Sequence, residues 1–257
     1  MALHLSCVNN GGLFSVVRLD HVAELDVVTP LSDEDLTALA CWQARVGEVV
    51  TVIDSESSAY RARLLDLEPG QAACLPFERL STPVESPLRI EVCQSLPDRE
   101  RFELILQKLT ELGVARIVPM ESHHSTTLQE RDARQRKSHR WPEVIRRAAR
   151  QCRRAMLPEL MPVLTFPEAL ACVAGAELKL MLYEGDAPWS FTEGFGSLKP
   201  QSVALLIGPE GGFSQEEVEQ AGAEGFLPVS LGPRILRTET AAIVAAALVQ
   251  SYLGDLR

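Results

Sequence analysis

The feature that most constrains the fold is a regular alternation of short apolar segments and helical segments after Pro87. The apolar segments predict strands at Leu88–Val92, Ile117–Pro119, Leu178–Tyr183, Val203–Ile207 and Leu227–Leu231. The intervening segments predict helices at Asp98–Leu112, Lys137–Arg154, Ser214–Gly222 and Glu239–Leu253. Strands that alternate with helices form a mostly parallel sheet covered on both faces. The chain is therefore expected to hold an α/β domain.

The region before Pro87 has a different pattern. Val49–Asp54 and Tyr60–Leu67 contain period-two alternation, and turn residues at Ser55–Ser58 and Pro69-Gly70 bound them. This pattern predicts a small sheet or barrel. Three prolines and few strong core positions mark the segment from 75 to 87 as a linker. We therefore expect two domains, 1–75 and 76–257.

Composition narrows the class of protein. Hydrophobic residues make up 46% of the 257 residues, which is ordinary for a globular chain. The longest apolar run, Ala241–Val249, is too short to span a membrane. The first ten residues lack the basic and apolar segments of a signal peptide. These features favour a cytoplasmic protein without a membrane segment.

The cysteines and histidines give little support for a metal site. Six cysteines are spread along the chain without a CxxC pair, so neither a zinc site nor a disulfide framework is expected. His123 and His124 are adjacent, but no cysteine or histidine lies nearby at helical ligand spacing. We expect no metal.

Charge is distributed unevenly. The net charge is −10, yet residues 128–154 hold ten of the 25 basic residues and only three of the 35 acidic ones. A basic strip on an acidic body is typical of a surface that binds a polyanion such as RNA. The alternative is a solvated helix whose arginines pair with local acids. The candidate RNA-binding residues are Arg131, Arg134, Arg146, Arg147, Arg150, Arg153 and Arg154.

A glycine-rich turn follows the strand expected at Val203–Ile207. The sequence from Leu205 reads Leu-Leu-Ile-Gly-Pro-Glu-Gly-Gly-Phe-Ser-Gln-Glu-Glu, and Ser214 and Glu217 have capping-box spacing. Glycines at the carboxyl end of a strand let a ligand approach the backbone, and ligands bind at that edge of an open α/β sheet. The spacing matches neither the dinucleotide fingerprint nor a P-loop. A purely structural turn is the alternative.

A second loop has the same layout. Leu231-Gly-Pro-Arg-Ile-Leu-Arg-Thr-Glu-Thr-Ala begins at an expected strand end and leads into the last helix. Arg234 and Arg237 place cations beside Glu239, so the loop could bring both signs of charge to a substrate. Helix capping by Thr238, with Glu239 favoured by the helix dipole, is the alternative.

The two loops together resemble the RsmE family of the SPOUT methyltransferase superfamily, which methylates N3 of a uridine in 16S ribosomal RNA. Gln107–Val114, and Pro158-Glu159 after the arginine-rich helix, also match the family, and the resemblance covers residues 90–257. It implies a C-terminal SPOUT trefoil-knot domain preceded by a small PUA-like β-barrel that helps to bind RNA. The aligned Ser122–Ser125 and Arg150–Arg154 depart from the family pattern.

The resemblance also implies S-adenosylmethionine as cofactor, a homodimer, and 16S ribosomal RNA or the small subunit as partner. The implied cofactor-binding residues are Tyr183, Glu184, Ile207, Gly208, Pro209, Glu210, Gly211, Gly212, Leu231, Gly232, Ile235, Leu236, Arg237, Thr238, Thr240 and Ala241.

For catalysis we expect Arg237 to supply a cation and either Glu210 or Glu239 to act as base, because N3 must lose a proton before it attacks. Two alternative functions are a related methyltransferase for another RNA or a ribose 2′-hydroxyl, and an RNA-binding module without catalysis.

Overall fold

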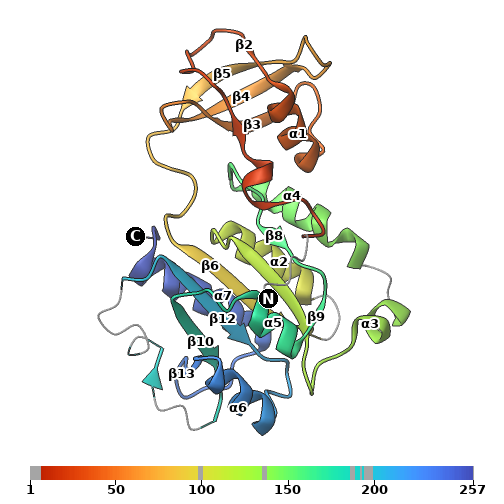
Figure 1. The fold of residues 1–257 in the computed structure, drawn as a ribbon, viewed down its shortest axis with the longest axis vertical. Coiled ribbons are helices and arrows are strands. Elements are labelled where there is room, and N and C mark those ends of the chain that lie inside the picture. Colours follow the sequence, from red (N-terminus) through yellow and green to blue (C-terminus); the bar gives the residue numbers. More distant parts are fainter. Residues whose placement is uncertain are drawn as a thin grey trace.

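The computed structural model describes residues 7–97, 101–134, 138–185, 189–191, 193 and 199–256. The predicted starts of two helices, Asp98 and Lys137, lie outside these residues. The chain forms a small sheet and a large sheet that follow one another along its longest axis (Figure 1).

The small sheet has five strands in the order β1-β3-β4-β5-β2. Its elements are the 3-10 helix η1 (Gly12–Ser15), β1 (Val17–Arg18), β2 (Thr29–Pro30), α1 (Asp33–Trp42), β3 (Val49–Ile53), β4 (Ala59–Asp66) and β5 (Ala73–Arg79). Alternate residues of β3 and β4, including Val52, Ala62 and Leu64, are fully buried in a core of their own. Among the described residues no ladder joins β1 to β2, so a closed barrel stays a prediction.

The large sheet has the order β11-β13-β10-β12-β6-β7-β8, with β9 also paired to β7, and all its pairings are parallel. This confirms the predicted parallel α/β architecture. The strands are β6 (Arg89–Ser95), β7 (Arg116–Glu121), β8 (Glu159–Leu160), β9 (Leu164–Thr165), β10 (Leu178–Leu182), β11 (Trp189–Ser190), β12 (Ser202–Ile207) and β13 (Leu227–Ser230).

Helices cover both faces of the large sheet. They are α2 (Arg101–Glu111), α3 (Leu128–Arg134), η2 (Ser138–Arg140), α4 (Trp141–Gln151), α5 (Phe166–Cys172), α6 (Gln215–Ala223) and α7 (Thr238–Leu253). Leu205 of β12 packs in the core beneath α2, α4 and α7, whereas Leu206 packs in the core beneath α5 and α6. Successive strand residues are thus buried on opposite faces, which is why the sequence of β12 is continuously apolar.

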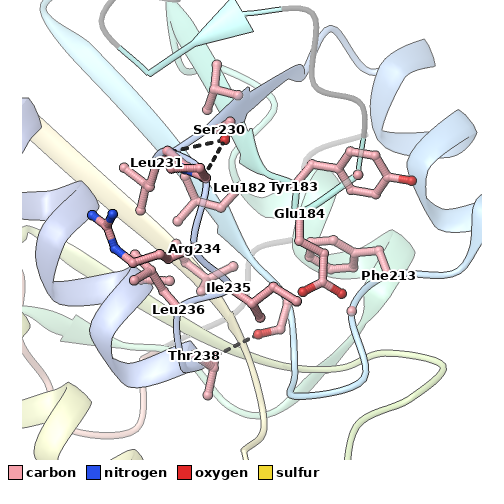
Figure 2. A pocket seen from close by; sticks show the side chains of 18 of the residues that line it. Leu182, Tyr183, Glu184, Phe213, Ser230, Leu231, Arg234, Ile235, Leu236 and Thr238 are labelled. Atoms are coloured by element: carbon pink, nitrogen blue, oxygen red, sulfur yellow. Dashed lines mark hydrogen bonds between the residues drawn. The ribbon is translucent and has the colours of Figure 1, made fainter.

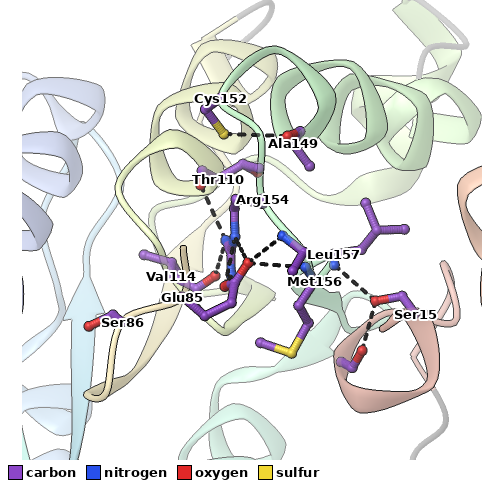
Figure 3. A network of polar contacts seen from close by, with 12 residues as sticks. Ser15, Glu85, Ser86, Thr110, Val114, Ala149, Cys152, Arg154, Met156 and Leu157 are labelled. Carbon is purple, nitrogen blue, oxygen red and sulfur yellow. Dashed lines mark hydrogen bonds and ion pairs between the residues drawn. The ribbon is translucent and has the colours of Figure 1, made fainter. Parts of the chain in front are cut away.

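The junction between the two sheets is held by Arg154 and Glu85 (Figure 3). β5 continues to Arg79, past the boundary expected at residue 75, so the connection to the large sheet comprises residues 80–88. Glu85 of this connection accepts hydrogen bonds from Arg154 and from the backbone of Ala155 and Met156. The domain division itself stays a prediction.

Among the described residues, no helix is both long enough and apolar enough to cross a membrane.

Candidate functional site

Three loops at the carboxyl edge of the large sheet enclose a pocket of about 620 Å³ (Figure 2). The loops follow β10, β12 and β13, which are neighbours in the sheet in the order β13-β10-β12. Parallel strands end at the same edge, so loops far apart in the sequence meet there. The pocket is the kind of concave, partly apolar site that binds a small molecule.

Twelve of the sixteen residues expected to bind cofactor line this pocket. They are Tyr183, Glu184, Ile207, Gly208, Gly211, Gly212, Leu231, Gly232, Ile235, Leu236, Thr238 and Ala241. The other four are not on the pocket wall: Pro209, Glu210 and Arg237 lie on the same loops, and Thr240 lies in the first turn of α7. Sequence reasoning missed seven lining residues: Leu182, Gly185, Phe213, Val229, Ser230, Pro233 and Arg234. Most of these directly adjoin a predicted residue, and only the folded loops show that they share its wall.

The glycines of the glycine-rich turn occupy positions that have no room for a side chain. Gly212 has φ of +70°, which disfavours residues with a Cβ atom, and a Cβ there would lie 2.9 Å from Glu184 Oε1. A Cβ at Gly211 would lie 2.9 Å from the Cβ of His124. The turn therefore presents backbone atoms to the pocket because larger residues would collide with its surroundings.

The segment Ser122–Ser125 supports the turn from outside. The Nδ1 atom of His124 lies 3.2 Å from the carbonyl oxygen of Gly212, and the backbone N–H of His123 donates to Glu217 Oε1 over 2.8 Å. Because a carbonyl oxygen only accepts hydrogen bonds, the His124 contact requires the proton on Nδ1. His124 thus contacts the pocket wall, whereas His123 contacts α6 behind it. Among the described residues, no three His, Cys, Asp or Glu side chains group as potential metal ligands.

Thr238 joins the loop after β12 to the loop after β13. Its Oγ1 donates to the carbonyl oxygen of Gly208 over 2.6 Å and accepts from Gln94 Nε2 over 2.9 Å. Thr238 is buried, and Gln94 is fully buried at the end of β6. This hydrogen-bond chain fixes the first turn of α7 against the glycine-rich turn.

Arg101 was not predicted from the sequence, yet it contacts both candidate bases. Its Nη1 lies 2.7 Å from Glu210 Oε1, and its Nε lies 3.8 Å from Glu239 Oε1. Arg237 caps α7 by position but, within the described part of the chain, its exposed side chain makes no hydrogen bond or ion pair. No local motif marks Arg101, because its partners come from loops more than 100 residues away.

The predicted basic strip is divided by the fold. Arg131, Arg146 and Arg154 are buried, so little of each side chain can meet a polyanion. Arg131 donates to the carbonyl oxygen of Pro97, and Arg146 pairs with Glu143. Arg154 instead contributes to the junction between the two sheets. The reason is that residues at helical spacing point in several directions, including toward the core.

The remaining arginines of the strip differ in their roles. Arg150 pairs with Glu48 and donates to the carbonyl oxygens of Trp42 and Gln43, which ties α4 to the small sheet. Among the described candidate RNA-binding arginines, Arg147 and Arg153 are exposed, with 78% and 59% of their side chains accessible. Arg134 ends α3, and its side chain lies outside the described part of the structure.

All six cysteines are free thiols. Burial raises the pKa of the Cys74 thiol to about 12, and burial also raises that of Cys93 well above its ordinary value. Thiols with raised pKa values are poor nucleophiles at neutral pH. The buried cysteines therefore belong to the cores and not to the candidate site.

The chain matches the model of the RNA methyltransferase domain over residues 84–250. It is 36% identical over 209 residues to ribosomal RNA small subunit methyltransferase E of Synechocystis, covering 80% of this chain and 67% of that protein. It is 31% identical over 242 residues to the protein of that name from Mycobacterium bovis, covering 92% of this chain and 90% of the relative.

Solved structures agree with these matches. A ribosomal RNA small subunit methyltransferase E from Neisseria gonorrhoeae, bound to S-adenosylmethionine, superposes with a TM-score of 0.65 at 32% identity, covering 93% of this chain and 98% of that one. A methyltransferase from Legionella pneumophila, in complex with the same cofactor, gives 0.66 at 33% identity, covering 94% and 99%. The chain therefore belongs to the ribosomal RNA small subunit methyltransferase E family, within the RNA methyltransferase domain family.

Proposed function

We propose that the protein transfers a methyl group from S-adenosylmethionine to N3 of a specific uridine in 16S ribosomal RNA. The observation that carries this proposal is the pocket at the ends of β10, β12 and β13, which gathers twelve of the residues that the family resemblance implies for the cofactor. Two relatives that match most of the chain are both ribosomal RNA small subunit methyltransferase E proteins, and two similar solved structures hold S-adenosylmethionine.

The pocket has the size and lining that such a cofactor requires. Its volume of about 620 Å³ falls within the range of small-molecule sites. Gly208, Gly211 and Gly212 expose backbone groups to hydrogen-bond the polar parts of the ligand, while Leu231 and Leu236 supply apolar wall. When bound, S-adenosylmethionine supplies an electrophilic methyl group on a positively charged sulfur.

The chain itself must prepare the uridine. N3 carries a proton, so a carboxylate from Glu210 or Glu239 accepts that proton while a nearby cation stabilises the anion. Arg237 is our candidate cation because it is exposed beside the pocket residues Leu236 and Thr238. Holding N3 in line with the methyl carbon lowers the barrier further.

RNA recognition in this proposal involves both domains. Arg147 and Arg153 are exposed members of the basic strip, and Arg153 also pairs with Glu78 of β5 over 3.7 Å. We propose that the small sheet is a PUA-like barrel that binds RNA, that the pocket loops form a trefoil knot, and that two copies assemble as a homodimer in the cytoplasm without a metal ion. The family resemblance is the ground for these finer assignments, and the parallel large sheet is compatible with the knotted domain among them.

Nucleoside mass spectrometry tests the reaction. Small subunits from a strain that lacks the protein should be without one 3-methyluridine, and the purified protein with S-adenosylmethionine should restore it. A methyl group on a ribose 2′-hydroxyl would instead indicate a different acceptor. RNA binding without cofactor binding would indicate a non-catalytic module, which a cofactor titration detects.

A further inference from the structure

Glu239 and Glu210 both contact Arg101, but their surroundings differ. Glu210 has 38% of its side chain exposed, and its Oε1 is engaged by the guanidinium at 2.7 Å. Glu239 has only 13% exposed, and its closest atom, Oε1, lies 3.8 Å from Arg101 Nε. The second oxygen of Glu239, Oε2, is buried and makes no hydrogen bond with any described residue. Glu239 is therefore the carboxylate with an unused, desolvated acceptor.

An unused buried acceptor needs an explanation, because a buried carboxylate oxygen without a hydrogen bond has lost its contact with water and gained nothing in return. Groups of this kind are retained where they bind a ligand. Thr238, Gly208 and Gly211 line the pocket. Glu239 is one residue beyond Thr238, and Glu210 lies between the two glycines. The cluster thus borders the pocket where two of its loops meet.

Arg101 offers the matching donor. Its Nη1 and Nε face the two glutamates, and no hydrogen bond within the described residues uses its Nη2. The side chain is 36% exposed, so this nitrogen can reach a ligand from solvent. A donor beside an acceptor complements the edge of uracil, where the N3–H group lies beside carbonyl oxygens.

We infer that Glu239 is the proton acceptor for the uridine and that Arg101 binds the adjacent carbonyl oxygen. This inference rests on the proposed function and selects between its two candidate bases. The N3–H bond breaks, its electron pair stays on N3, and Glu239 Oε2 takes the proton. The electron pair on N3 then forms the bond to the methyl carbon, while the sulfur keeps the pair of the broken carbon–sulfur bond. Glu239 afterwards releases its proton to water.

In this arrangement Arg101 has two roles. Its guanidinium stabilises the negative charge that spreads from N3 onto the carbonyl oxygens, and its ion pair with Glu210 holds it beside Glu239. Glu210 is a positioning residue because it acts through Arg101. Arg237 stays available as a second cation at the start of α7.

The test is single-turnover methylation of small subunits by Glu239→Gln, which keeps the size of the side chain but removes the acceptor charge. We expect the rate to fall by about 100-fold or more, with unchanged cofactor affinity. The rate of the variant should rise about tenfold per pH unit, because only uridine already ionised by solvent reacts. Subunits containing 5-fluorouridine, whose N3 proton is more acidic, should rescue the variant more than the wild type.

Two further variants keep the test decisive if Glu239→Gln fails to fold. Arg101→Gln should lower the rate by roughly 100-fold, and Arg101→Lys should restore part of it. Lys108→Gln is the matched control, since it removes the ion pair to Glu111 at the other end of α2. A wild-type rate and pH profile in either Glu239→Gln or Arg101→Gln would overturn this inference and leave the proposed function standing. A wild-type protein that neither binds cofactor nor forms 3-methyluridine would overturn the proposed function.

Discussion

Thr238 Oγ1 donates a 2.6 Å hydrogen bond to the carbonyl oxygen of Gly208, which joins two loops separated by 30 residues in the chain. The same hydroxyl accepts from the buried Gln94, so one side chain connects β6, the glycine-rich turn and α7. Glycine-rich segments have many accessible conformations, so holding this turn in one shape requires contacts from outside it. The hydroxyl of Thr238 therefore helps to set the shape of the pocket wall.

Replacing Thr238 with valine should weaken cofactor binding. Valine has nearly the same shape but leaves the Gly208 carbonyl without this donor and Gln94 Nε2 without this acceptor. The free energy of unfolding should fall by about 1–2 kcal/mol, which denaturant titration measures. Thr37→Val is the control, since Thr37 bonds only to a carbonyl in an exposed helix. Unchanged cofactor affinity, measured by calorimetry, would show that the wall does not depend on this bond.

Gly211→Val should abolish cofactor binding while the fold survives. A Cβ at this position would lie 2.9 Å from the Cβ of His124, so the turn or the histidine segment must shift. Gly175→Val is a suitable control, because nothing lies within 4 Å of a Cβ there. Calorimetric titration with S-adenosylmethionine gives the affinity, and circular dichroism checks the fold.

The double variant Gly211→Ala with His124→Gly separates two causes of that loss. If the collision with His124 displaces the turn, removing the Cβ of His124 should restore part of the affinity lost in Gly211→Ala. If the ligand itself needs the space at Gly211, the double variant stays as weak as the single one. A Gly211→Val variant with wild-type affinity would remove this turn from the cofactor site.

The strands of the large sheet were predictable because burial on both faces makes them continuously apolar. β12 is an example from Val203 to Ile207, since Ala204 faces one core while Leu205 faces the other. β10 follows the same pattern except at Lys179, with Met181 in one core and Leu180 in the other. The two-residue strands β8, β9 and β11 were not predicted, because segments so short contain no period to detect. Their positions depend on neighbouring strands rather than on local sequence.

The candidate site was predictable only where backbone chemistry leaves a mark in the sequence. Gly208, Gly211 and Gly212 form such a mark because a turn that approaches a ligand excludes side chains. The pairing of Arg101 with Glu210 leaves no such mark in the sequence, since any surface arginine could form an ion pair with that glutamate. Charge counts likewise do not show that Arg154 is buried at the junction between the two sheets.

Arg147 and Arg153 should contribute to the RNA affinity of the basic strip. Replacing both with glutamine removes two exposed cations and should reduce the salt slope of RNA binding by roughly 1–2. Cofactor affinity should stay the same because neither residue lines the pocket. Lys199→Gln, an exposed cation outside the strip, is the control. An unchanged salt slope in filter-binding assays would assign both arginines to the solvated surface.

Arg154→Met should destabilise the junction between the two sheets. The side chain of Arg154 is 3% exposed and donates to Glu85 and to the carbonyl oxygens of Thr110 and Val114. Removing one partner of a buried ion pair costs about 3 kcal/mol because the other group is left uncompensated. Thermal unfolding should show a lower Tm, and proteolysis should cut more readily within residues 80–88. Arg147→Met, at an exposed position of the same strip, should leave the Tm unchanged.

Arg237→Ala tests whether Arg237 acts in catalysis or braces the loops. Arg101, and not Arg237, pairs with Glu210 and Glu239, and the exposed Arg237 side chain has no partner among the described residues. Its removal should therefore leave stability and dimerisation largely unchanged. Cofactor affinity should also persist, because Arg237 does not line the pocket.

Single-turnover methylation at saturating RNA and cofactor should nevertheless slow in Arg237→Ala, by roughly 100-fold if its charge stabilises the uridine anion. Arg237→Lys should recover part of the rate, because a cation remains near the anion. Arg234→Ala is the comparison within the same loop: Arg234 lines the pocket, so we expect that change to act on cofactor affinity instead. Normal turnover in Arg237→Ala would leave Arg101 as the cation at the uridine, and a lower Tm with normal turnover would make Arg237 a structural residue.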